Sequence, residues 1–260
     1  MDRVASRRQV PLDRCYHYRG YRYGGFGNNP YEDFILGLAG GGQAEILRRE
    51  FAWRVLNCRA RSMGEALQID IIDWPLWEYP WARRPASSRR EFDEPRDNPD
   101  VMCHFSAPGV LASHINREFG WLEGAWRNIS GQGYRPRQYG FVRCVELDAG
   151  EASSYLVVDG NHRLSALHAL GETSLEVELL RFRKVRRDRA EAWPRVRDGS
   201  IGLGHALRVF DRYFAQRNPP LVARHPAALI ADAAPLWSAP GADFESAGPS
   251  VDMAMVLGQA

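Results

Sequence analysis

The hydrophobic positions follow a helical period in some segments and a strand period in others, which predicts a mixture of helices and strands. Apolar residues spaced three and four apart indicate helices with one buried face. Three segments have this spacing: residues 47–58, 110–129 and 203–214. A capping box from Ser62 to Glu65 predicts a further helix directly after the first of them.

Shorter apolar runs predict three strands, at residues 141–147, 154–158 and 175–182. The third run alternates clearly, because apolar residues at odd positions are separated by Glu176 and Glu178. One face of this strand is therefore expected to be buried and the other to be exposed to solvent. A helix over residues 163–170 lies between the second and third strands.

The remaining segments carry turn and linker signals. Residues 1–14 are basic and predict a loosely ordered leader, whereas residues 16–31 are rich in glycine and aromatic residues and predict loops. Prolines and charges predict a flexible linker at residues 82–100, and the tail from Pro219 is expected to be irregular. We therefore expect a helical, aromatic-rich N-terminal extension (1–81), the linker (82–100), a compact core (101–183), and a C-terminal helix with an irregular tail (184–260).

Four aromatic residues, Trp74, Trp77, Tyr79 and Trp81, lie close together among prolines. They could form an aromatic binding surface, or they could pack an irregular segment onto the core. Asn28, Asn29 and Tyr31 likewise allow two interpretations, as residues that close over a ligand or as ordinary turn residues.

The composition and net charge of the chain mainly exclude classes of function. The 260 residues carry a formal net charge of +2, so no bulk attraction for nucleic acid is predicted. Lys184 is the only lysine and does not lie in a Gly-Lys-Ser/Thr loop, so a Walker-type phosphate loop and the lysine of a protein-kinase fold are absent. Phosphate chemistry would have to use arginine, histidine and backbone N–H groups.

Cysteine, histidine and hydropathy patterns exclude other classes. The four cysteines form no Cys-x-x-Cys pair, and His104 and His114 lack supporting zinc-ligand spacing. The N-terminus lacks the apolar segment of a signal peptide, and no apolar run reaches the roughly 20 residues of a membrane span. We expect a cytoplasmic protein with reduced thiols.

The strongest chemical signal is the segment Tyr155–Leu167, where a predicted strand leads through a glycine turn directly into a helix. Free N–H groups and the helix dipole make such a turn an anion site. Arg163 and His162 would add donors for phosphate, and Asp159 would orient them or help to hold Mg²⁺. The alternative is a structural turn in which a polar side chain caps the helix.

The Asp159–Leu167 segment, followed by Leu170-Gly171 and a strand, resembles the signature of the ParB/sulfiredoxin superfamily. The upstream order of a helix, glycines and a strand agrees with this resemblance, which covers about residues 101–183. It implies an α+β fold with a small mixed β-sheet core and flanking helical extensions. It also implies that the turn binds nucleotide phosphates through Gly160, Asn161, His162, Arg163 and Ser165.

The resemblance implies different functions for different members of the superfamily. Sulfiredoxin carries a cysteine in the turn, where this chain has Asn161 or His162, and ParB proteins carry a two-helix DNA reader that is not evident after Phe182. Kinase members need a carboxylate base on or just before the first helix of the unit. Glu118 and Glu123 are the candidates, although both could be ordinary solvated helix charges.

We therefore expect a nucleotide-dependent phosphotransferase that uses ATP, ADP or CTP with Mg²⁺, with Glu118, Glu123, Asp159 and His162 as candidate catalytic residues. A looser similarity to ParB-like proteins of bacterial surface-polysaccharide gene sets suggests a small-molecule or glycan acceptor. It is carried by Asn29-Pro30-Tyr31, by His104-Phe105-Ser106, and by Ala206-Leu207 with residues 210–214. The alternative is a non-catalytic nucleotide-sensing or DNA-associated protein. The basic run 181–189 could contact nucleic acid or a polyanionic glycan, or be a solvated strand end. His168 is expected on the helix surface.

Overall fold

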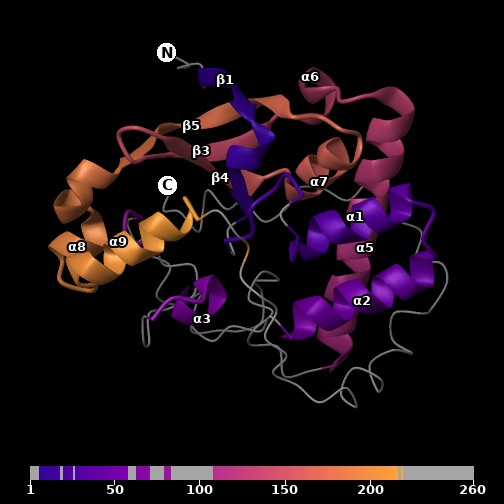
Figure 1. Cartoon of the computed structure of the whole chain (residues 1–260), viewed down its shortest axis with the longest axis horizontal. Coiled ribbons are helices and arrows are strands. Elements are labelled where there is room, and N and C mark those ends of the chain that lie inside the picture. The colour runs from indigo at the N-terminus through magenta and orange to yellow at the C-terminus, as the bar shows by residue number, and fades with distance from the viewer. Residues whose placement is uncertain are drawn as a thin grey trace.

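The computed structural model describes residues 6–17, 20–25, 27–57, 63–70, 79–82, 108–215 and 218. These residues form an α+β fold around one mixed sheet (Figure 1). The strands are β1 (Ser6–Pro11), β2 (Cys15–His17), β3 (Val142–Asp148), β4 (Ser153–Asp159) and β5 (Ser174–Arg186). The α-helices are α1 (Pro30–Ala39), α2 (Ala44–Asn57), α3 (Met63–Leu67), α5 (Pro108–Gln132), α6 (Pro136–Tyr139), α7 (Asn161–Ala169), α8 (Pro194–Arg197) and α9 (Leu203–Arg212). Two 3₁₀ turns are η1 (Leu12–Arg14) and η3 (Arg187–Ala192).

The sheet has the strand order β1-β5-β3-β4-β2. The pairs β1/β5 and β3/β4 are antiparallel, whereas β5/β3 and β4/β2 are parallel. Both edge strands therefore come from the first 17 residues of the chain. The prediction of a loosely ordered leader is wrong for residues 6–14, and the segment 1–81 contributes directly to the sheet. The reason is that β1 is a largely exposed edge strand, whose polar residues carry no apolar period.

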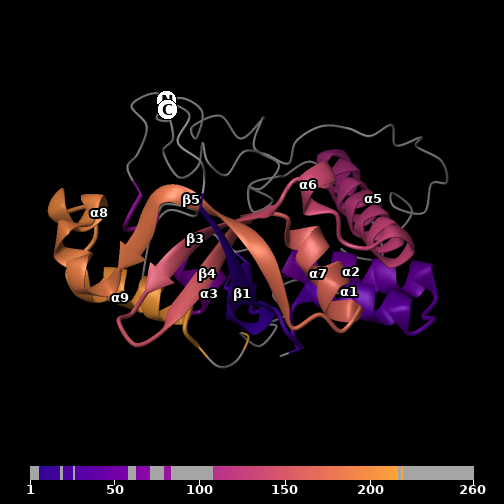
Figure 2. The same ribbon diagram turned by 90° about the horizontal axis from the view of Figure 1, so that it is seen from above.

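The helices form two groups at opposite ends of the sheet (Figure 2). One group contains α1, α2, α5 and α7, which pack against one another through the apolar cluster of Phe34, Phe51, Phe119 and their neighbours. The other contains α3, α8 and α9, whose core includes Met63, Phe210 and Tyr213. Beneath α7, residues such as Leu164, Val142 and Val177 join the first group to the sheet.

Several predicted elements are confirmed to within a few residues. The predicted helices correspond to α2, α5, α7 and α9, and the predicted strands to β3, β4 and β5. The start of α3 at Met63 agrees with the capping box. Helix α1 was not predicted, because residues 16–31 were interpreted as loops. Its start is marked by the Asn29 side chain, which accepts a hydrogen bond from the backbone N–H of Tyr31 at 3.2 Å.

Two of the four clustered aromatic residues lie in the core. Tyr79 is fully buried and stacks on Trp81 with their ring centroids 5.1 Å apart. Trp81 in turn contacts Trp193 and Phe210 edge-on. Core packing therefore accounts for these two residues.

Other sequence predictions fall outside the described residues. They are Trp74, Trp77, His104-Phe105-Ser106, residues 83–100 of the predicted linker, and the tail from Pro219. Within the described part of the chain, none of the helices is both long and apolar enough to cross a membrane.

Candidate functional site

The turn between β4 and α7 depends on a glycine. Gly160 has φ = +94° and forms the N-cap of α7. A Cβ atom there would lie 2.9 Å from Val142 Cγ2 and within 3.2 Å of the Arg163 guanidinium. Leu164 N–H donates to Gly160 O at 3.0 Å, so the backbone N–H groups of residues 161–163 have no acceptor within the helix.

Arg163 fixes this turn against the beginning of β3. Its guanidinium donates to the carbonyl oxygens of Tyr139 and Gly140 and to Asp159 Oδ2, the last at 3.1 Å. Most of the planar donor fork is therefore occupied by protein acceptors. Arg163 acts here as a structural contact, and the Asp159 carboxylate is its ion-pair partner.

His162 points in another direction and meets a carboxylate from α5. Its Nε2 atom lies 2.7 Å from Glu118 Oε2, although the residues are 44 positions apart in sequence. The imidazole lies near the rings of Tyr31 and Trp121, with centroids 5.9 and 5.6 Å away. The His162 side chain is 22% exposed and that of Glu118 only 8%, so His162 is the member of the pair that reaches solvent.

Glu123, the second candidate base, has a different partner. Its Oε1 atom accepts hydrogen bonds from Arg48 Nη2 at 2.6 Å and from Arg48 Nε at 2.9 Å. This ion pair joins α5 to α2. The structure thus brings Glu118 to the motif and ties Glu123 to the neighbouring helix.

The other motif side chains hold the beginning of α7. The Tyr23 hydroxyl donates to Asn161 Oδ1 at 2.9 Å, and burial raises the pKa of Tyr23 well above its usual value. Ser165 is fully buried and its hydroxyl donates to Asn161 O at 3.2 Å. Ser165 therefore lies inside the helix packing and does not line a ligand surface.

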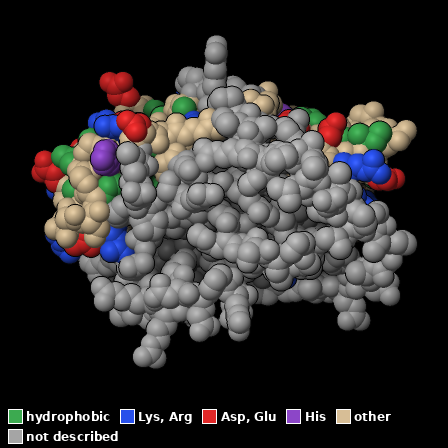
Figure 3. All heavy atoms as spheres, turned by 90° about the horizontal axis from the view of Figure 1, so that it is seen from below, with side chains coloured by type: hydrophobic (Ala, Val, Ile, Leu, Met, Phe, Trp, Pro, Cys, Tyr) green, Lys and Arg blue, Asp and Glu red, His purple; other side chains and the backbone are tan. Residues whose placement is uncertain are grey.

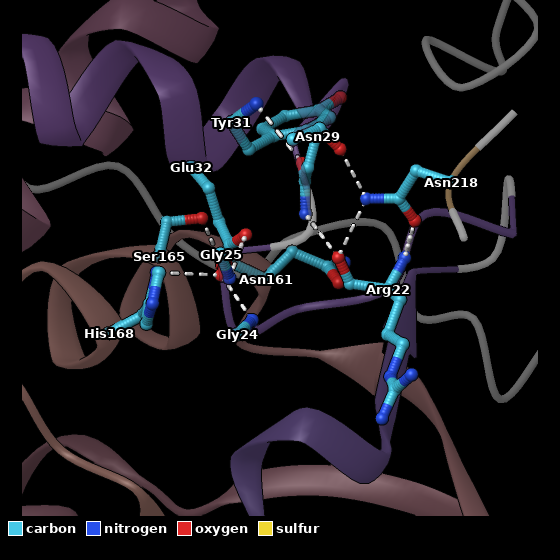
Figure 4. Close-up of polar contacts among 11 residues, drawn as sticks. Arg22, Gly24, Gly25, Asn29, Tyr31, Glu32, Asn161, Ser165, His168 and Asn218 are labelled. Atoms are coloured by element: carbon cyan, nitrogen blue, oxygen red, sulfur yellow. Dashed lines mark hydrogen bonds and ion pairs between the residues drawn. The ribbon is translucent and has the colours of Figure 1, made fainter. Parts of the chain in front are cut away.

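A buried carboxylate connects the glycine-rich segment to α7 (Figure 4). Glu32 Oε1 accepts a hydrogen bond from Gly24 N–H at 2.7 Å, and Oε2 accepts one from Gly25 N–H at 3.3 Å. His168 Nδ1 lies 3.0 Å from Glu32 Oε1. Glu32 is only 1% exposed. His168 is 20% exposed, so it lies at the helix surface as predicted, but its side chain also faces a buried carboxylate, which the sequence did not predict.

The glycine-rich segment, residues 16–31, contacts both His162 and the C-terminal residue Asn218. Tyr31 lies between His17 and His162, with its ring centroid 4.9 Å from that of His17. Asn218 Nδ2 donates to Arg22 O at 3.1 Å, and Asn218 also accepts from Arg22 N–H, as Figure 4 shows. Asn29 caps α1, so it needs no ligand, whereas Tyr31 does contact the motif.

The Glu32–His168 pair predicts a pH-dependent contribution to stability. The hydrogen bond with Glu32 raises the pKa of His168 above its usual value. The contribution should be complete below the unfolded-state pKa of about 6.5 and be lost as pH rises through the higher folded-state pKa. The free energy of unfolding of the wild type minus that of His168→Gln, from urea titrations, should fall across this window. A difference that stays constant or grows with pH would contradict the pairing.

Three basic residues of the run 181–189 have acidic partners, whereas the side chains of residues 181–183 lie outside the described part of the structure. Lys184 Nζ lies 2.9 Å from Asp148 Oδ2, and Arg187 pairs with Asp211 at 2.8 Å. Figure 3 shows basic and acidic side chains intermixed on the flank of the molecule that carries α8 and α9. For residues 184–187, these pairs favour the interpretation as a solvated strand end.

The described residues offer no gathered metal ligands. Among them, no group of three or more His, Cys, Asp or Glu side chains is placed to hold a metal ion. Asp159, the predicted Mg²⁺ ligand, instead pairs with Arg163.

Comparison with known proteins leaves the function to be argued from this geometry. The chain matches no protein-family model, no curated protein and no solved structure. The resemblance of the 159–167 segment to the ParB/sulfiredoxin signature therefore stays a prediction.

Proposed function

We propose that this chain is a nucleotide-dependent phosphotransferase that acts on a hydroxyl group of a small molecule or glycan. The observation that carries the proposal is the His162–Glu118 pair, 2.7 Å long, at the N-terminal end of α7. An imidazole oriented by a buried carboxylate is suited to general-base catalysis. The same helix end provides N–H groups that have no acceptor within the helix and suit an anion.

The pair assigns the two residues different tasks. With Nε2–H donating to Glu118, the lone pair of His162 Nδ1 is left to accept the proton of the acceptor hydroxyl. Glu118 then stabilises the imidazolium that forms. Because Glu118 is the less exposed member, we assign the base to His162 and a positioning role to Glu118. This reverses the order of roles that the sequence suggested.

The beginning of α7 would receive the nucleotide phosphates. The N–H groups of residues 161–163 and the positive end of the helix dipole favour negative charge there. Asn161 accepts from Tyr23 through Oδ1, which leaves its amide group as a further donor. Arg163 contributes by fixing the turn and not as a free phosphate ligand.

The described residues gather no group of three ligands that would hold Mg²⁺. Asp159 is paired with Arg163, and no other acidic or histidine side chain joins it in a metal-binding group within the described part of the chain. We therefore derive no step through Mg²⁺ bound to the protein. A nucleotide would have to bring the ion on its own phosphates.

Phosphorus NMR tests the proposal directly. The full chain would be incubated with ATP, ADP or CTP, Mg²⁺, and a panel of hydroxy amino acids, monosaccharides and polysaccharides. A new phosphomonoester resonance that depends on the protein and on one acceptor is the expected result. Calorimetry with the same nucleotides runs in parallel. Nucleotide binding without transfer to any acceptor would instead support the nucleotide-sensing alternative.

A further inference from the structure

A charged cavity lies beside the motif, and neither His162 nor Glu118 lines it. Its volume is about 550 Å³, within the range of small-molecule sites. The lining residues are Arg7, Pro136, Arg137, Gly140, Phe141, Arg143, Asp159 and Glu178. Two of the lining residues, Gly140 and Asp159, accept hydrogen bonds from Arg163 of α7. The cavity therefore lies near the beginning of α7, as the His162–Glu118 pair does, but it is lined by other residues.

The strand register explains why charges gather there. Arg7 on β1 pairs in register with Glu178 on β5, and Glu178 pairs with Arg143 on β3. Arg143 in turn pairs with Asp159 on β4. A row of alternating charge therefore crosses four strands at one end of the sheet. Helix α6 adds Arg137 to this row.

The positive charges of this row exceed the negative ones. Asp159 pairs with Arg163 at 3.1 Å, and the Glu178 carboxylate lies 3.8 Å from Arg143. The Arg7 guanidinium lies over the Phe141 ring, 4.1 Å from its centroid. Neither Arg7 nor Arg137 has an ion-pair partner among the described residues. Two arginines from different elements thus line one cavity, and each of its two carboxylates already has an arginine as ion-pair partner.

We propose that this cavity binds the phosphate group of a phosphorylated small molecule. Guanidinium groups form paired, charge-assisted hydrogen bonds with phosphate oxygens, which favours phosphate over a singly charged anion. The cavity is larger than one phosphate needs, and the Phe141 ring offers an apolar wall, so the ligand extends beyond its phosphate. The proposal goes beyond phosphate transfer and does not depend on it.

Calorimetry on the full chain tests the site at constant ionic strength. The probes are inorganic phosphate, ADP and glucose 6-phosphate, with adenosine and glucose as uncharged counterparts. The test variant combines Arg7→Gln with Arg137→Gln. The matched control combines Arg127→Gln with Arg135→Gln, because both of these are exposed and neither lines the cavity. Circular dichroism checks that all variants fold.

The wild type and the control should bind a phosphorylated probe, and the test variant should bind it at least tenfold more weakly. Equal affinities for all phosphates would contradict a ligand that extends beyond its phosphate, whereas tighter ADP binding that the test variant loses would identify a nucleotide site in this cavity. Equal binding by test variant and control, or no binding by the wild type, would overturn the proposal. Phosphate transfer is measured on the same variants. Binding lost only in the test variant, with no transfer by any of them, would separate a failure of phosphate transfer from a failure here.

Discussion

Replacing His162 by Gln is expected to lower the rate of phosphate transfer by about 10²–10⁴-fold, the usual contribution of a general base. The glutamine amide retains a donor toward Glu118, which lies 2.7 Å from the imidazole Nε2, but it cannot accept the hydroxyl proton. The loss should therefore fall on kcat, with nucleotide affinity retained. Single-turnover transfer, followed by phosphorus NMR, and calorimetric nucleotide binding would measure the two effects separately.

Two glutamates provide the comparison for this prediction. Glu118→Gln should slow transfer less than His162→Gln, because the base remains but its orientation and charge partner are lost. Glu123→Gln removes the ion pair with Arg48, and should leave transfer near the wild-type rate. Equal losses in Glu118→Gln and Glu123→Gln, or full activity of His162→Gln, would show that the imidazole is not the base.

The apolar periods predicted the elements that have one clearly buried face. Strand β5 is one example, since Leu175 and Val177 are buried on either side of the exposed Glu176. Helix α5 is another, since its predicted apolar residues Phe119, Leu122 and Ile129 are buried. Strand β1 has no such pattern, because only Val10 of its six residues is buried. Its place in the sheet depends on pairing with β5, which is more than 160 residues away in sequence. Local patterns contain no information about such a pairing.

In the candidate site, too, the sequence pattern does not show which distant residues come into contact. Glu118 and Glu123 border the apolar face of α5 from opposite sides, so the helical period leaves them equivalent as candidates. Only the packing of α5 against α7 and α2 distinguishes them, because it places His162 beside one and Arg48 beside the other. The motif itself could be located from the sequence. So could the pairing of Asp159 with Arg163. The other partners of Arg163 could not, since they are backbone carbonyl groups at the end of α6.

Glu32→Ala is expected to reduce the free energy of unfolding by about 3–5 kcal/mol, as for other buried charge pairs that lose one partner. The substitution leaves the N–H groups of Gly24 and Gly25 without their acceptor and removes the partner of His168. Such a loss is a large part of the 5–15 kcal/mol that stabilises a typical domain. Urea titrations at pH 6, where His168 is charged, would measure it.

Glu45→Ala is the matched control, because Glu45 is an exposed residue of α2 whose ion-pair partner is the exposed Arg49. Exposed pairs of this kind contribute about 0.3–0.5 kcal/mol, so this variant should stay close to the wild type. Glu32→Gln should fall between the two variants: its amide oxygen can still accept from Gly24, but it carries no charge for His168. Its stability should also depend less on pH between 6 and 8 than that of the wild type. Similar losses in Glu32→Ala and Glu45→Ala would contradict the role of Glu32 as the buried connection between the glycine-rich segment and α7. Because that segment carries both Tyr23 and Tyr31, which contact Asn161 and His162, weakening this connection should also disturb the site.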